Sequence, residues 1–178
     1  VKMNTEAFGG TIAVESEPGK GTEFTIHLKA PYMSGEDYHM HYTAAKLQTN
    51  LAGKKILLVE DHKLNMEIAK KILEKKQMKV TCAYNGAEAV ALFEKMPEYT
   101  FDAVIMDIRM PVMNGLEAAA AIRAGAKADA KTIPIIAMSA NAFAEDMEKS
   151  RRAGMNRHVA KPVEPERLFG VLSEIFSD

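Results

Sequence analysis

The chain has 178 residues, of which 47% are hydrophobic and 26% charged, as in an ordinary soluble globular protein. Its formal net charge of −1 leaves no basic footprint for nucleic acid, and no apolar run approaches the roughly 20 residues that span a bilayer. The single cysteine, Cys82, excludes a disulfide within one chain and favours a reducing, cytoplasmic setting.

Residues 1–30 predict a short helix end over 1–8 and then a β-hairpin. Polar and apolar side chains alternate on both sides of a Pro-Gly turn, which places on one face Ile12, Val14, Phe24, Ile26 and Leu28. The turn glycines fit neither common phosphate-loop spacing, so they predict a turn only. Because an isolated hairpin is marginal in water, we expect its apolar face to pack on the rest of the chain or on a second copy, as a homodimer.

Residues 31–52 predict a linker, because Pro31, Gly35 and a polar run interrupt any periodicity. His39 and His41 form an H-x-H pair within it. No cysteine or carboxylate stands beside them at the spacing of a metal site, so a solvated pair is the better interpretation.

From residue 53 to 178, apolar runs alternate with amphipathic segments. The runs predict strands at Ile56–Val59, Met78–Ala83, Ala103–Met106 and Ile133–Met138, and Arg157–Ala160 is predicted as a short fifth strand. Helices are predicted between and after the strands. The helix after the first strand has an inward face formed by Ile68, Ala69, Ile72 and Leu73. Two further helices are predicted over Leu116–Ala124 and Ala142–Ala153, and the last begins at Pro165, with an inward face formed by Leu168, Val171, Leu172 and Ile175. This alternation predicts an α/β domain with a doubly wound, five-stranded parallel sheet.

Asn85-Gly86 is a possible hairpin turn between two strands. Ala89, Val90 and Phe93 follow it at helical spacing, however, and therefore predict a helix after the second strand.

Chemically reactive side chains stand where the predicted strands end. They are Glu60 and Asp61 after the first strand, Asp107 after the third, Ser139 after the fourth and Lys161 after the fifth. The carboxyl ends of parallel strands share one edge, where α/β proteins bind ligands. Carboxylates gathered there repel unless a cation joins them, and oxygen ligands suit Mg²⁺. A carboxylate can also accept a phosphoryl group, whose charge Lys161 and Ser139 would stabilise.

The strings LLVED, VIMDIRMPVMNG, PIIAMSANA and HVAKPVEPERL resemble the receiver domain of two-component response regulators. The resemblance implies a flavodoxin-like fold with strand order 2-1-3-4-5. It implies that Asp107 accepts phosphate from a histidine and that Ser139 and Lys161 bind the phosphoryl oxygens. It also implies a Mg²⁺ site formed by Asp61, Asp107, Glu60 through water, and the Arg109 backbone carbonyl.

Two positions depart from the family pattern. Glu60 replaces a more frequent Asp and keeps the charge, and His158 stands where the family often has Tyr or Phe. In the family, the hydroxyl residue and this ring form a switch, so Ser139 is expected to move toward the phosphoryl group. Because burying imidazole is costly, His158 is expected to turn inward only when neutral, or to stay outside in both states. The Lys161-Pro162 bond is expected to be cis.

The string GGTIAVESEPGKGTEFTIHL resembles the last hairpin of a histidine kinase ATP-binding domain. The resemblance implies that the ATP-binding boxes lie before Val1, so ATP binding is not carried over to residues 1–30. Together the two resemblances imply the C-terminal part of a hybrid histidine kinase, whose own kinase core phosphorylates the receiver. A separate histidine phosphotransfer protein would then take the phosphate. The chain itself is expected to be a self-catalysing phosphoacceptor without membrane contact, although its parent can be membrane-anchored.

Two other functions fit part of the pattern. A phosphatase of the haloacid dehalogenase type also uses an Asp after a strand, but it wants a second Asp two residues later, where this chain has Arg109. A receiver-like docking module that is never phosphorylated is the other alternative, and the intact acidic pair with Asp107, Ser139 and Lys161 argues against it.

Overall fold

The computed structural model describes residues 11–17, 19, 21–27, 50–140 and 144–177. The chain divides into two compact units, Val1–Lys46 and Leu47–Asp178. None of the helices in the described ranges combines the length and the apolar composition that a membrane span requires. The predicted helix end at 1–8, Leu28 and the His39/His41 pair lie outside the described residues.

The N-terminal unit contains the predicted hairpin, formed by β1 (Thr11–Glu17) and β2 (Gly21–His27). Val14 lies directly opposite Phe24, and both side chains are more than half exposed. The left-handed backbone of Gly19 and Gly21, with φ of +79° and +106°, allows the tight reversal between the strands. The hairpin prediction is confirmed.

The C-terminal unit is built on one parallel sheet. Its strands are β3 (Lys55–Val59), β4 (Lys79–Ala83), β5 (Ala103–Asp107), β6 (Ile135–Ser139) and β7 (Arg157–Ala160). They lie in the order β4-β3-β5-β6-β7, and every neighbouring pair is parallel. In chain order this is 2-1-3-4-5, so the predicted doubly wound topology is confirmed.

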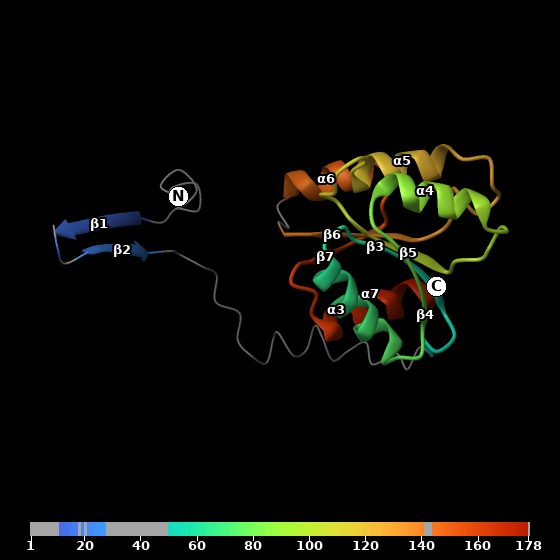
Figure 1. The fold of residues 1–178 in the computed structure, drawn as a ribbon, viewed down its shortest axis with the longest axis horizontal. Helices are drawn as coiled ribbons and strands as arrows, with labels where there is room; N and C mark the ends of the chain where they lie inside the picture. Colours follow the sequence, from blue (N-terminus) through green and yellow to red (C-terminus); the bar gives the residue numbers. More distant parts are fainter. Residues whose placement is uncertain (1–10, 18, 20, 28–49, 141–143, 178) are drawn as a thin grey trace. The chain divides into compact units, whose positions relative to one another are not determined.

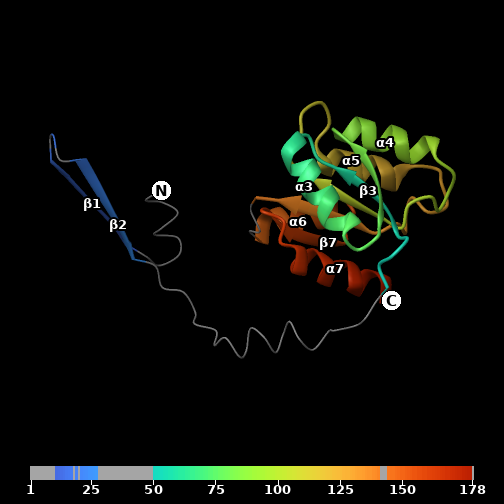
Figure 2. The same ribbon diagram turned by 60° about the horizontal axis from the view of Figure 1, so that its bottom comes forward.

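Helices cover both faces of this sheet (Figures 1 and 2). One face carries α3 (Lys63–Glu74) and α7 (Pro165–Ser177), and the other carries α4 (Gly86–Lys95), α5 (Gly115–Ala124) and α6 (Ala144–Arg152). Successive residues of β5 point alternately into the two resulting cores, which is why the whole strand is apolar up to Asp107.

The Asn-Gly pair before α4 begins a helix, as the spacing after it predicted. The Asn85 side chain accepts a hydrogen bond from the Glu88 backbone N–H at 2.9 Å. This N-cap satisfies a donor that the first turn would otherwise leave without a partner.

The inward face of α3 differs from the prediction. The buried residues are Met66, Ala69 and Leu73, whereas the side chain of Ile68 is 47% exposed. Met66 shares the buried stripe with Ala69 and Leu73 at helical spacing, and Ile68 lies about 100° around the helix from Ala69. Leu51, in the predicted linker, is buried in the core on the α3 and α7 side.

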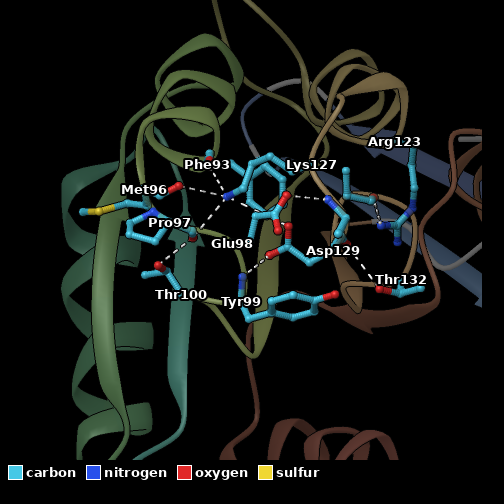
Figure 3. Close-up of polar contacts among 12 residues, drawn as sticks. Phe93, Met96, Pro97, Glu98, Tyr99, Thr100, Arg123, Lys127, Asp129 and Thr132 are labelled. Carbon is cyan, nitrogen blue, oxygen red and sulfur yellow. Dashed lines mark hydrogen bonds and ion pairs between the residues drawn. The ribbon is translucent and has the colours of Figure 1, made fainter.

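Polar contacts tie the loops at the amino ends of the strands (Figure 3). The Lys127 ammonium donates to the backbone carbonyls of Phe93, Met96 and Pro97, at 2.7, 3.1 and 3.2 Å. A carboxylate oxygen of the buried Asp129 accepts from the Tyr99 N–H at 2.7 Å. These bonds join the loop after α4 to the loop after α5.

The chain enters and leaves the C-terminal unit at one corner. The Lys54 ammonium lies 4.5 Å from the centre of the Phe176 ring, in the last turns of α7. It also pairs with Asp102 at 3.3 Å, and the same carboxylate accepts from the Lys55 N–H at 2.7 Å. These contacts hold the start of β3 against the end of α7.

Candidate functional site

The carboxyl ends of the central strands bring Glu60, Asp107 and Lys161 into contact. The Lys161 ammonium lies 2.5 Å from Glu60 Oε2 and 2.6 Å from Asp107 Oδ2. Glu60 follows β3, Asp107 ends β5 and Lys161 follows β7, so the sheet topology makes this contact between residues that are far apart in sequence. The predicted gathering of charged side chains is present at this edge.

Glu60 is held by more than the lysine. Its side chain is almost fully buried, and Oε1 accepts hydrogen bonds from the His62 N–H at 3.3 Å and from Asn65 Nδ2 at 3.1 Å. Oε2 is thereby directed to Lys161. The sequence analysis missed Asn65, whose only signal was its place in the first turn of the helix after Glu60.

Asp107 is buried, with 5% of its surface exposed. Its Oδ1 accepts from the Arg109 N–H at 3.1 Å, while Oδ2 faces Lys161. Burial raises the pKa of the Asp107 carboxyl above its ordinary value, and the hydrogen bond from Lys161 only partly offsets this. Burial lowers the pKa of Lys161, but the hydrogen bonds to Asp107 and Glu60, together with the negative charges of these two carboxylates, outweigh burial and leave that pKa raised.

Asp61 completes an acidic cluster at the mouth of the site. One carboxylate oxygen from each of Glu60, Asp61 and Asp107 lies within 4.8 Å of the others. Asp61 is exposed, whereas the other two residues are buried. Three hard oxygen donors at this spacing fit Mg²⁺, which takes few carboxylates and keeps several waters.

The side chains of Ser139 and His158 form a hydrogen bond with each other. Ser139 ends β6 and is buried, and its Oγ lies 2.7 Å from Nε2 of His158 on β7. The prediction placed both residues at the site, but it did not foresee a direct hydrogen bond between them. His158 is partly buried and in contact with Ser139 rather than simply exposed.

The loop after Asp107 is closely packed against the end of β5. A Cβ atom on Gly115 would lie 2.1 Å from the Asp107 carbonyl oxygen, so only glycine fits there. Val112 has a left-handed backbone, with φ of 70°, and the Met113 N–H bonds to the Pro111 carbonyl at 2.8 Å across it. The Lys161-Pro162 bond is cis, as predicted.

The chain matches the family model described as response regulator receiver domain over residues 56–173. The autoinducer 2 sensor kinase/phosphatase LuxQ of Vibrio vulnificus is 35% identical over 174 residues, which cover 97% of this chain and 19% of LuxQ. Sensor histidine kinase AruS of Pseudomonas aeruginosa is 32% identical over 176 residues, which cover 98% of this chain and 16% of AruS. The chain therefore spans less than a fifth of either relative.

Solved structures give the same picture. The receiver domain of sensor histidine kinase PA1611 from Pseudomonas aeruginosa, with magnesium coordinated in its active site cleft, is 36% identical with a TM-score of 0.64; the match covers 71% of this chain and 100% of that domain. The receiver domain of Saccharomyces cerevisiae Ssk1, in complex with the phosphotransfer protein Ypd1, is 27% identical with a TM-score of 0.63. The match covers 71% of this chain and 90% of that one.

Proposed function

Because the chain belongs to the response regulator receiver domain family, we propose that Asp107 accepts a phosphoryl group in a phosphorelay. The observation that carries the proposal is the position of Asp107. It is a buried carboxylate at the end of β5, 2.6 Å from the Lys161 ammonium and beside two further acidic residues. An isolated structural ion pair would not need the adjoining acidic cluster at the mouth of the sheet.

The transfer itself exchanges one bond for another. A carboxylate oxygen of Asp107 attacks the phosphorus of a phosphohistidine, the N–P bond breaks as the O–P bond forms, and the imidazole leaves with the electron pair of the N–P bond. Positioning and charge stabilisation are the main needs of such a step. Lys161, already within hydrogen-bond distance of Asp107, supplies a positive charge for the incoming oxygens, and Ser139 supplies a hydroxyl donor.

Mg²⁺ fits the acidic cluster and would neutralise part of the phosphoryl charge when bound. Asp61 and Asp107 would hold it directly, Glu60 through water, and the Arg109 carbonyl would be a third protein ligand. The cluster of three carboxylate oxygens within 4.8 Å supports this assignment. The magnesium in the active site cleft of the PA1611 receiver supports it by similarity.

The comparisons with known proteins support two partners for the receiver. The phosphate donor is the histidine kinase core of the parent chain, and a histidine phosphotransfer protein is the next acceptor. In this second transfer an imidazole nitrogen of the acceptor attacks the phosphorus on Asp107, the N–P bond forms and the O–P bond to Asp107 breaks. The similarity to a receiver bound to a phosphotransfer protein supports this order. The parent is a hybrid histidine kinase, and residues 1–30 are the end of its ATP-binding domain; matches to LuxQ and AruS over nearly the whole chain support this.

Mass spectrometry after treatment with acetyl phosphate and Mg²⁺ tests the proposal. The chain should gain one phosphate, and D107N should gain none, because the amide keeps the shape but loses the nucleophilic charge. D102N is the matched control, since Asp102 also binds a lysine but lies at the other end of the strands. Equal phosphate gain in D107N and the unchanged chain would reject Asp107 as the acceptor.

A further inference from the structure

We propose that Asn65 is a positioning residue for the Mg²⁺ site: its amide fixes the orientation of the Glu60 carboxylate, and this restraint is needed because position 60 carries Glu in place of Asp. The inference rests on the proposed function, in which Glu60 reaches the metal through water. The observation that carries it is the hydrogen bond from Asn65 Nδ2 to Glu60 Oε1, at 3.1 Å.

The two oxygens of the Glu60 carboxylate have separate partners. Oε1 accepts from the amide of Asn65 and, at 3.3 Å, from the His62 backbone N–H, whereas Oε2 lies 2.5 Å from the Lys161 ammonium. An ionised carboxylate can only accept hydrogen bonds, so the amide nitrogen of Asn65 is the donor. Because the backbone bond is long, the Asn65 amide is the main restraint on Oε1.

The length of the Glu60 side chain makes this restraint necessary. Glu has one more rotatable bond than Asp and therefore more freedom to lose when it is held in one orientation. Glu60, Asn65 and Lys161 also line a cavity of about 130 Å³, together with Ile68 and Pro162. A carboxylate that Asn65 did not hold would have this space to turn into.

An Asp at position 60 would not depend on Asn65 in the same way. Its carboxylate would end about 1.5 Å nearer the backbone, too short for the present contact with the amide. The long, flexible side chain of Lys161 could follow the shorter acid, whereas the amide on its short stem could not. Asn65 and Glu60 are therefore matched in length, and the benefit of one depends on the presence of the other.

Calorimetric titration of the full chain with Mg²⁺ tests this dependence. Groups that orient metal ligands typically change affinity about 10- to 100-fold, and because Glu60 acts through water we expect N65A to bind Mg²⁺ about tenfold more weakly. In the E60D background, N65A should change the affinity less than about twofold. E60D/N65Q, in which the amide gains the length that the acid has lost, should bind more tightly than E60D/N65A.

The controls concern folding and the choice of helix residue. Ala forms helices better than Asn does, so N65A should keep α3 intact, which circular dichroism verifies. K71A removes an exposed side chain from the last turn of the same helix and should leave Mg²⁺ affinity unchanged.

A second readout needs no metal. In chelator, the NMR signals of the Asn65 side-chain amide should shift in E60D, whereas those of Asn114, which caps α5, should not. Unchanged Mg²⁺ affinity in N65A, an equal loss in both backgrounds, or Asn65 signals that do not respond to E60D would overturn the inference. Phosphate gain by the unchanged chain would still support the proposed function in those cases. A chain that neither bound Mg²⁺ nor gained phosphate would reject both.

Discussion

Replacing Lys161 with Met would expose how strongly one ammonium holds the site together. Lys161 stands between two buried carboxylates, at 2.5 and 2.6 Å, and Met keeps its length but removes its charge. Breaking a buried ion pair by removing one partner costs about 3–5 kcal/mol. Because 19% of the Lys161 side chain is exposed and water can reach the site, we expect the lower end, a loss of ~3 kcal/mol in the free energy of unfolding.

Urea unfolding followed by circular dichroism measures this loss, first with a chelator and then with Mg²⁺. Mg²⁺ binds the same carboxylates and should stabilise K161M more than the unchanged chain; a ligand at 100 times its dissociation constant adds ~2.7 kcal/mol. K131M, an exposed loop lysine, is the control and should lose almost nothing. Adding E60Q to K161M should recover part of the loss, because only one buried charge then remains.

A loss below about 1 kcal/mol in chelator would refute the reasoning, since it would place Lys161 among surface ion pairs. An equal loss with and without Mg²⁺ would show that the metal does not reach these carboxylates. Either result would also weaken the proposed role of Lys161 in binding the phosphoryl group.

Three further outcomes are expected. Asp61→Ala should weaken Mg²⁺ binding in a calorimetric titration, and unchanged affinity would contradict the proposed ligand set. Gly115→Ala should lower the free energy of unfolding by about 3 kcal/mol, because the new Cβ meets the Asp107 carbonyl; full stability with normal phosphate uptake would be inconsistent with the packed loop. Burial raises the pKa of the Cys82 thiol, so at mildly alkaline pH iodoacetamide should alkylate Cys82 more slowly than it alkylates the thiol of free glutathione, and the rate for Cys82 should increase as pH rises. If the two thiols still react at different rates in urea, burial is not the cause.

The sequence was most informative where periodicity and strand ends coincide. Apolar runs bounded by turns placed the three central strands of the parallel sheet, and the alternation with helices placed the two edge strands. The charged residues that follow the central strands and the last strand had to meet because parallel strands share one carboxyl edge. Asp107 and Lys161 were therefore predictable as neighbours, although 54 residues separate them.

Contacts that depend on the phase of a helix or on sheet register were not accessible in this way. The apolar residues of α3 are compatible with an inward face that includes Ile68, and only packing against the sheet shows that the buried stripe begins at Met66. The Ser139–His158 bond follows from the pairing of His158 with Ala137, which no local pattern reveals. Asn65 binds Glu60 through a side-chain contact across a helix start, and a polar residue there gives no distinctive signal.

The corner formed by Lys54, Asp102 and Phe176 has a mechanical consequence. Since the chain reaches the first strand and finishes the last helix at the same place, tension between any attached segments would be borne across that corner (Figure 2). The force would not run along the strands to the edge that carries Asp107. A domain with this arrangement can be linked to a moving neighbouring domain without deformation of the edge that carries Asp107. It can also be inserted into another chain at little conformational cost.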